Sequence, residues 1–259
     1  MLSRRANISS PYDVQGIDDL SESLHSIANV YRAKGEFQRA LQFSEQVLKR
    51  RKAVAALSDE EHVTKLIRAH EDIIALTKLV SRDETGALDK SKFGEVGSHL
   101  IEVGKLYERK LKKSMKALLY YHEAMDVFKQ LNDYRQMKCC LILMGTVHAH
   151  SSSTQKALAC FSKAFLLTMS KKSSVLEDAD LLHNIGNCLA KQGEFKKSIV
   201  SYRDSLKIKK ALLPLIDVSV AKTEHCVSSG RVPCQCHLCC LASKVSFSFV
   251  VGIVTCSAW

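Results

Sequence analysis

Hydrophobic residues recur along this chain with the spacing of amphipathic helices, and one pattern is repeated several times. Leu24, Ile27, Ala28 and Tyr31 stand at positions i, i+3, i+4 and i+7, which is one face of a helix. The same frame opens on leucines at positions 24, 66, 100, 141 and 182, in steps of 42, 34, 41 and 41 residues. We therefore expect tandem units of two helices each. The unit that begins near Leu66 lacks a convincing second helix.

Small residues occupy two fixed places in these units. They lie four positions after the opening leucine and at the start of the second-helix motif, as Ala28, Gly104, Gly145, Gly186 and as Ala40, Ala117, Ala157, Ser198. A glycine inside a helix costs about 1 kcal/mol relative to alanine. Three glycines at equivalent sites therefore indicate helices that cross closely, with larger side chains beside them.

Two nearly identical phrases mark the predicted turns of the first and last clear copies. AKGEFQRAL runs from Ala33 to Leu41 and AKQGEFKKSI from Ala190 to Ile199, and their glycines are 193 − 35 = 158 residues apart, close to four steps of about 40. In each phrase the glycine is expected to end one helix, and the small residue to let the next helix pack closely against it.

A leucine, a small residue four on, an aromatic seven on, a turn glycine and small–aromatic–small on the next helix resemble the tetratricopeptide repeat. The resemblance covers about 17–225, and the step near 41, together with DVSVAKT (Asp217–Thr223), is most similar to kinesin-light-chain-type repeats. Ser44 replaces the aromatic of the first copy, and the family's Asn-Asn pair is absent. The resemblance implies a scaffold that binds peptides or partner proteins.

The predicted fold is all-α, a right-handed α-solenoid of stacked antiparallel helix pairs similar to a tetratricopeptide superhelix. We expect a disordered leader over 1–16, an array of about five units over 17–225 with a further unit starting near 217, and a Cys-rich, apolar, poorly ordered tail over 226–259. A kinesin light chain should carry a long coiled coil before its repeats, for which 1–16 is too short. We therefore expect either a fragment or shared repeats alone.

The tail loses acidic residues and helical periodicity at one point, which favours an alternative, truncated or mis-joined C-terminus. Two other interpretations stay open. The tail could be palmitoylated or rest on a membrane, or it could form a zinc site, for which the candidate ligands are Cys234, Cys236, His237, Cys239 and Cys240.

Composition and charge bear on the cellular location and on the classes of partner that the chain could bind. Apolar residues make up 46% of the chain, and no apolar secretory segment opens it, so a reducing, cytoplasmic location is expected. The formal charge of 38 − 27 = +11 permits an acidic protein, nucleic acid or an anionic membrane. Cations lie at the predicted ends of second helices, where they complement the helix dipole or alternatively align as a positive ridge. They are Lys49, Arg50, Arg51, Lys52, Lys171, Lys172, Lys207, Lys209 and Lys210. A further cluster lies in the turn of the third copy, namely Arg109, Lys110, Lys112, Lys113 and Lys116.

Exposed positions on the first helices are the candidate binding residues, because first helices of stacked pairs line a concave surface. A groove with polar side chains suits an extended or helical peptide. The alternative is that a solvated helix needs a polar face in any case. The candidates are Glu22, His25, Asn29, Arg32, Lys105, Glu108, Thr146, Asp180, His183 and Asn187.

The sequence contains no G-x-x-x-x-G-K-[ST], G-x-S-x-G or H-E-x-x-H motif, so neither an enzyme nor a cofactor is expected. His148 and His150 with Cys139 and Cys140 could hold a metal, but His148 takes a position that is tyrosine in two other copies. A core position is favoured, and no metal site is predicted.

We predict a non-catalytic protein–protein interaction scaffold that holds a peptide or partner protein in the concave groove, in the first instance a kinesin-light-chain-like cargo adaptor. The alternatives are a regulatory scaffold of a signalling or ciliary assembly and a basic binder of nucleic acid or membrane surfaces. Nucleic acid, membrane and small molecules are not the expected partners.

Overall fold

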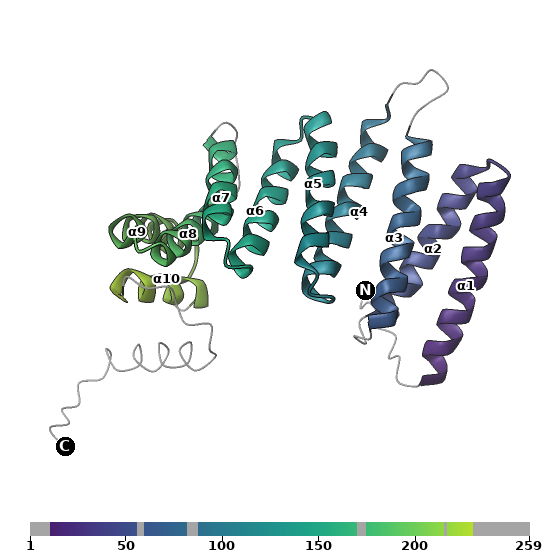
Figure 1. The fold of residues 1–259 in the computed structure, drawn as a ribbon, viewed down its shortest axis with the longest axis horizontal. Helices are drawn as coiled ribbons and strands as arrows, with labels where there is room; N and C mark the ends of the chain where they lie inside the picture. Colours follow the sequence, from purple (N-terminus) through teal and green to yellow (C-terminus); the bar gives the residue numbers. More distant parts are fainter. Residues whose placement is uncertain (1–10, 56–59, 82–87, 170–174, 215–216, 230–259) are drawn as a thin grey trace. The chain divides into compact units, whose positions relative to one another are not determined.

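The computed structural model describes residues 11–55, 60–81, 88–169, 175–214 and 217–229, and these form ten α-helices (Figure 1). The chain divides into two compact units, 1–140 and 141–259. The helices are α1 (Pro11–Ala33), α2 (Phe37–Ala55), α3 (Glu60–Val80), α4 (Lys90–Arg109), α5 (Ser114–Gln130), α6 (Tyr134–His150), α7 (Thr154–Met169), α8 (Val175–Lys191), α9 (Phe195–Leu212) and α10 (Val218–Ser229). The predicted all-α class is confirmed. Within the described ranges, no helix is long and apolar enough to cross a bilayer.

Both predicted ends of the array shift. Residues 11–16, which the prediction placed in the leader, belong to α1, and proline is compatible with a first helical turn because its missing N–H would have no partner there. Helix α10 continues to Ser229, past the predicted boundary at 225. The leader residues 1–10 and the tail from 230, with its candidate zinc ligands, lie outside the described residues.

The predicted close crossing of paired helices is observed directly. In the third, fourth and fifth copies, a glycine lies four positions after the opening leucine. A Cβ added to it would lie 2.4–2.6 Å from a ring carbon of the paired helix. The pairs are Gly104 with Tyr121, Gly145 with Phe161 and Gly186 with Tyr202. All three aromatic side chains are buried. In the first copy, the buried Ala28 replaces the glycine and the buried Ser44 replaces the aromatic residue. The larger residue on one helix is thus matched by a smaller residue on the other.

The turns between paired helices need a left-handed residue. Gly35 has φ 77° and Gly193 φ 80°, as their repeated phrase predicts. In the third and fourth copies the corresponding turns use Lys112 at φ 54° and Ser152 at φ 57°, a conformation that costs a residue with a side chain more than it costs glycine.

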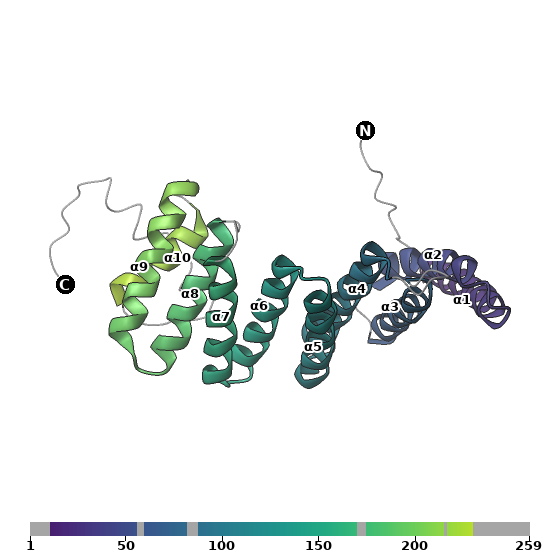
Figure 2. The same cartoon turned by 90° about the horizontal axis from the view of Figure 1, so that it is seen from above.

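Unit 1 is built in two layers, with α1, α3 and α5 in one and α2 and α4 in the other (Figure 2). Side chains connect alternate helices of the first layer. Asp72 on α3 accepts a hydrogen bond from Arg32 on α1, and Glu71 on α3 accepts one from Tyr120 on α5. Adjacent helices of opposite layers share the core, where the buried His70 on α3 contacts His99 on α4.

Helix α3 changes which layer the later first-helix motifs occupy. Helix α3 carries a first-helix motif, and so does α4, the next helix that the structure describes. Because successive helices alternate between layers, α4 lies opposite α1 rather than beside it. The premise that every first helix lines one surface therefore does not hold in unit 1.

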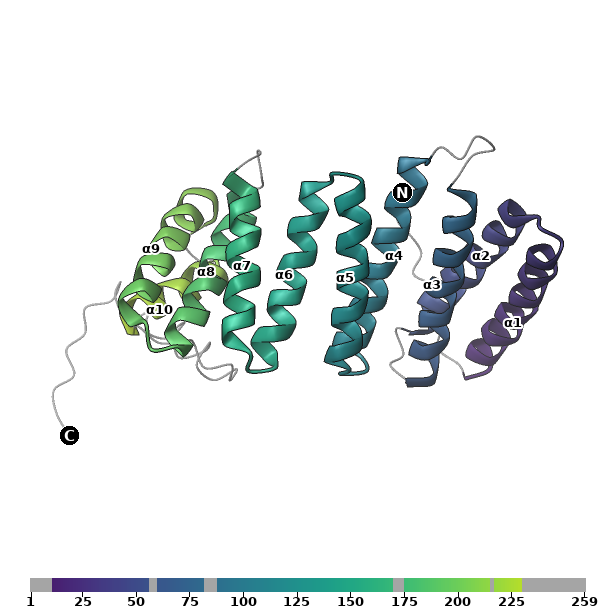
Figure 3. The same cartoon turned by 45° about the horizontal axis from the view of Figure 1, so that its top comes forward.

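Unit 2, which begins within α6 at Leu141, keeps the regular order of helix pairs. Helices α6 and α7 are antiparallel neighbours, and α8 and α9 form the next pair (Figure 3). The core between them gathers Ala157, Phe161 and Ala164 of α7 with Leu181 and Cys188 of α8. Helix α10 packs against this end through Val220, Thr223 and Cys226, all of them buried.

Candidate functional site

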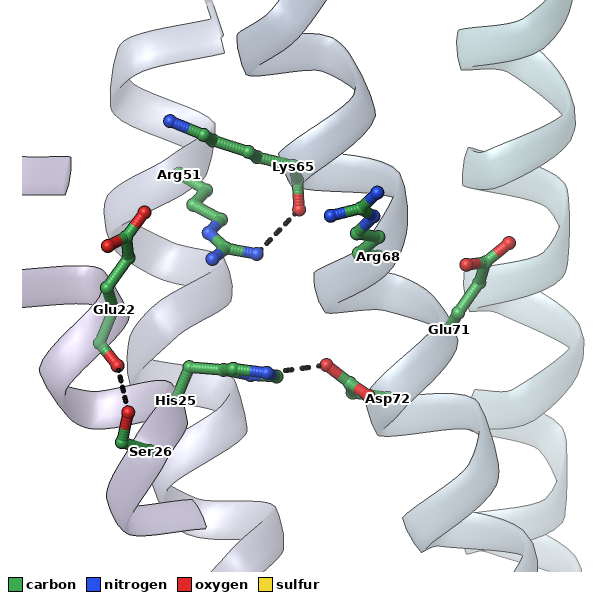
Figure 4. Close-up of a pocket in the computed structure, with 8 residues that line it drawn as sticks. All are labelled: Glu22, His25, Ser26, Arg51, Lys65, Arg68, Glu71 and Asp72. Atoms are coloured by element: carbon green, nitrogen blue, oxygen red, sulfur yellow. Dashed lines mark hydrogen bonds and ion pairs between the residues drawn. The ribbon is translucent and has the colours of Figure 1, made fainter. Parts of the chain in front are cut away.

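A polar hollow of unit 1 lies between α1 and α3, and we call it the α1–α3 pocket (Figure 4). Its volume is about 430 Å³. Its lining combines three basic and three acidic side chains with a histidine and a serine. The lining residues are Glu22, His25, Ser26, Arg51, Lys65, Arg68, Glu71 and Asp72.

Asp72 ties the predicted residues of α1 to α3. Its carboxylate accepts a hydrogen bond from Arg32 Nη2 at 3.1 Å and lies 3.4 Å from His25 Nδ1. Two of the four predicted residues of α1, Glu22 and His25, line the pocket, and Arg32 reaches the pocket acid Asp72. Asn29 is exposed on α1 outside the lining.

Arg51 forms the inner wall of the pocket. It lies on α2, is only 7% exposed, and donates from Nη1 to the backbone oxygen of Lys65 at 2.8 Å. Its buried Nε–H has no acceptor among the described residues. The carbonyl contact holds the guanidinium at the junction of α2 and α3.

Two guanidinium groups approach each other here. Burial is the main cause that lowers the pKa of Arg51, and the like charge of Arg68 lowers it further, while the carboxylates of Asp18, Asp72 and Glu22 oppose the shift. Asp18 in turn binds Lys65 Nζ at 2.7 Å. The pocket thus presents fixed donors and acceptors of both signs, which suits a polar peptide segment better than an isolated ion.

A second hollow adjoins the pocket through α3. Glu71, which lines the α1–α3 pocket, accepts a 2.5 Å hydrogen bond from the hydroxyl of Tyr120. Tyr120 itself lines a hollow of about 260 Å³ with Tyr107, Lys116, Leu119 and Glu123. Burial raises the pKa of Tyr120, and the hydrogen bond to Glu71 raises it further, so the phenol stays a donor at neutral pH.

The predicted residues on α4 do not join this surface. Lys105 pairs with Glu102 of the same helix at 2.7 Å, and Glu108 accepts the Tyr121 hydroxyl at 2.9 Å. Glu108 thus serves the packing of α4 on α5. Because α4 belongs to the second layer, these two residues are separated from the set on α1.

Unit 2 brings two predicted residues together in a smaller pocket. Thr146 and Asn187 line a hollow of about 180 Å³, with His150, Asn184 and Lys191 among the other lining residues. Asn187 also accepts the hydroxyl of the buried Tyr202 at 2.8 Å. The pocket has a mixed polar and apolar lining from α6, α7 and α8.

The other two predicted residues of α8 are engaged elsewhere in unit 2. Asp180 forms a 2.9 Å ion pair with the buried Lys209 of α9. His183 lies against Tyr202 and within 3.2 Å of the Thr223 hydroxyl on α10. Burial is the main cause that lowers the pKa of His183 to about 4, with the charge of Lys209 adding to it. A neutral His183 therefore belongs to the packing of α10.

Sequence reasoning missed most of the lining of the α1–α3 pocket. Lys65, Arg68, Glu71 and Asp72 lie on the degenerate copy, whose polar positions were not considered as a binding face. The signal was present as a polar stripe at i, i+3 and i+7, namely 65, 68 and 72. Arg51 was assigned to a cationic helix end, and its position three residues after a buried leucine, Leu48, gave only a weak hint of burial.

The structure also bears on metal binding and on the positive ridge. Among the described residues, no group of three or more His, Cys, Asp or Glu side chains could hold a metal. Arg51 and Lys209, two cations of the proposed ridge, are buried inside their units. Lys171 and Lys172 lie outside the described residues.

Comparison with known proteins places the repeats in a family. Family models described as tetratricopeptide repeat match residues 20–62 and 179–212, at α1–α3 and at α8–α9. No curated protein matches the sequence.

Several solved structures are similar to this chain at low sequence identity. A STAND-class signal transduction ATPase with a tetratricopeptide repeat sensor from Pyrococcus horikoshii matches at TM-score 0.56 and 10% identity over 93% of this chain, which spans 37% of that one. BtubC (BKLC) from P. vanneervenii matches at 0.45 and 15% over 78% of this chain and 84% of that one. A protein from Podospora anserina described as a kinesin light chain with nearly identical TPR-like repeats matches at TM-score 0.42 and 10% identity. The match covers 89% of this chain and 91% of that one. Two segments of this helical array, 20–62 and 179–212, are thus tetratricopeptide repeats.

Proposed function

We propose that this protein is a non-catalytic interaction scaffold that holds a polar peptide segment of a partner protein against the α1, α3 and α5 layer of unit 1. The supporting observation is the α1–α3 pocket, where three helices fix donors and acceptors of both signs around a buried arginine. Tetratricopeptide repeats generally mediate protein–protein interactions, which fits such a surface.

The binding step follows from the pocket's chemistry. A peptide backbone offers alternating N–H and C=O groups, and the exposed Arg68 and Glu22 can receive one of each. Asp72 and Lys65 are already paired with protein groups, so they hold the pocket's shape rather than seek a ligand. Little ordering of side chains is then needed on binding, which favours affinity.

Affinity purification with mass spectrometry tests this proposal, using wild type, Arg68→Glu and Arg203→Glu. Arg68 is exposed in the pocket, whereas Arg203 is exposed on α9 in unit 2, so both variants change the surface charge equally. We expect a partner that wild type and Arg203→Glu retain and that Arg68→Glu binds about tenfold or more weakly. An identical partner set for all three proteins would contradict a site in this pocket.

The same experiment separates the finer roles. A motor heavy chain among the retained partners supports a kinesin-light-chain-like cargo adaptor, which the repeat spacing favours. Signalling or ciliary components without a motor chain support a regulatory scaffold instead.

A further inference from the structure

The turn between α4 and α5 concentrates charge of one sign on the surface of unit 1. Residues 109–116 read RKLKKSMK, with five cations and no acid. We call these cations the basic turn, and all five are exposed. They are Arg109, Lys110, Lys112, Lys113 and Lys116.

Helix electrostatics do not account for this placement. Arg109 in the last turn of α4 and Lys110 at its C-cap do complement the helix dipole, but the other three cations are not placed in this way. Lys113 is the N-cap of α5 and makes no side-chain capping bond, and Lys116 follows in the first turn, which contains no acid. Cations at the N-terminus of a helix oppose its dipole. The chain thus accepts a local electrostatic cost at two positions.

Backbone conformation adds a third cost. Lys112 is left-handed at φ 54°, where the matching turns of the first and last copies use Gly35 and Gly193. A lysine in this conformation is strained relative to glycine. Because the uncharged Ser152 adopts the same conformation in the matching turn of the fourth copy, the five exposed cations, and not the strain, distinguish this turn.

Two apolar side chains project beside the basic turn. Met115 is 76% exposed and Leu119 is 68% exposed, and their i, i+4 spacing puts both on one face of α5. Lys116 lies between them in sequence, with its ammonium 5.3 Å from the centre of the Tyr107 ring. Cations and exposed apolar groups therefore share one end of the helix.

This combination favours a lipid surface over other anionic partners. Lysine is depleted at the cores of protein interfaces, and four of the five cations here are lysines. Single-stranded nucleic acid needs free aromatic faces for stacking, whereas Tyr107 stacks on Tyr120 at 5.4 Å and Lys116 lies over its ring. Lysines in the headgroup layer with apolar side chains at the acyl boundary are the arrangement of peripheral membrane sites.

We propose that the basic turn, with Met115 and Leu119, docks unit 1 on an anionic lipid bilayer. The lysines and Arg109 neutralise acidic headgroups, while the two apolar side chains leave water at the boundary of the acyl region. Lys113 exchanges its long 3.7 Å ion pair with the exposed Glu60 for lipid phosphate or carboxylate. This role is additional to peptide binding, and the α1–α3 pocket does not take part in it.

Vesicle co-sedimentation of the full chain tests the proposal, with phosphatidylcholine vesicles that contain or lack phosphatidylserine. Wild type should bind only the phosphatidylserine vesicles, and high salt should release it. Each cation near the surface contributes about fivefold to the partition coefficient, so Lys112→Glu/Lys113→Glu should lose at least about 25-fold. Met115→Ser/Leu119→Ser should lose about tenfold because less apolar surface is buried.

The matched control is Lys196→Glu/Lys207→Glu, which makes the same charge change at exposed positions of unit 2. It should retain binding within about twofold of wild type. An equal loss in this control would show attraction by net charge and overturn the assigned site. Binding to duplex DNA or RNA without binding to vesicles would overturn the lipid assignment.

Lys112→Gly separates a binding role from a structural one. Glycine relieves the left-handed conformation, so this variant should be more stable than wild type while binding vesicles about fivefold more weakly. A variant that gains stability with unchanged vesicle affinity would refute a membrane role for Lys112. Arg68→Glu should leave vesicle binding unchanged, so failure of the peptide site and failure of the lipid site are distinguishable.

Discussion

Gly104→Ala is the sharpest test of how the paired helices pack. Alanine normally improves a helix by about 1 kcal/mol over glycine. At this position, however, the new Cβ would lie 2.4, 2.7 and 3.0 Å from three ring atoms of Tyr121. That ring is fully buried, and its hydroxyl donates to Glu108 at 2.9 Å, so it cannot swing away cheaply. Overpacking of this kind costs about 1–3 kcal/mol or more. After the helix gain of about 1 kcal/mol is subtracted, we expect a net loss of up to about 2 kcal/mol.

The same helix supplies the control. Gly94 also lies inside α4, but a Cβ added there meets only Leu131 Cδ1 at 3.7 Å, an ordinary contact. Gly94→Ala should therefore stabilise unit 1 by up to about 1 kcal/mol. Urea unfolding followed by helical circular dichroism measures both variants, with unchanged m-values as the check that unfolding exposes the same surface. If Gly104→Ala were as stabilising as Gly94→Ala, close packing would not be the reason for the glycine.

Three further predictions concern titration, turns and buried charge. Burial lowers the folded-state pKa of His70 to about 3 and of His183 to about 4. Below about pH 6.5 the unfolded chain therefore binds more protons than the folded chain. For each histidine, the free energy of unfolding should fall by about 1 kcal/mol for every pH unit of acidification. Urea midpoints between pH 7 and 5 measure this, and His70→Gln should flatten the profile. Ser152→Gly should stabilise its left-handed turn by about 1 kcal/mol in a thermal melt, and a loss would contradict the assigned backbone. In urea unfolding, Lys209→Met should be neutral or stabilising and Asp180→Ala should be destabilising. Only Asp180→Ala leaves a buried charge, that of Lys209, without its partner. The reverse order of stability would contradict this pairing.

Much of the fold could be predicted from the sequence because repetition makes local signals agree. The glycines at 104, 145 and 186 identified the crossing points, and the repeated phrases identified the turns at Gly35 and Gly193. Both are short-range features that recur at a fixed step. Confidence in the helical pairs came from the agreement among copies, which a single copy would not have provided.

The candidate site was predicted only in part because its geometry depends on long-range placement. Glu22 and His25 were identified as polar positions on α1, but their partners are on a helix about 45 residues later in the chain. Lys105 and Glu108 were assigned to the same surface by a motif that α3 and α4 share. A motif identifies the type of a helix and not its layer, so one unpaired helix is enough to place α4 on the opposite side.

The departure of α3 from the repeat pattern and the location of the α1–α3 pocket have one physical cause. Among the residues that the structure describes, helix α3 has no second helix of its own, and it packs against α2 on one side and α4 on the other, burying Leu66, Ile73 and His70 there. Its remaining face is turned toward α1 and α5 of its own layer, where contacts are made by long polar side chains rather than by close helix crossing. Four of the eight pocket residues are on that face. The copy that retains least of the packing motif is thus the one that supplies half of the pocket's lining.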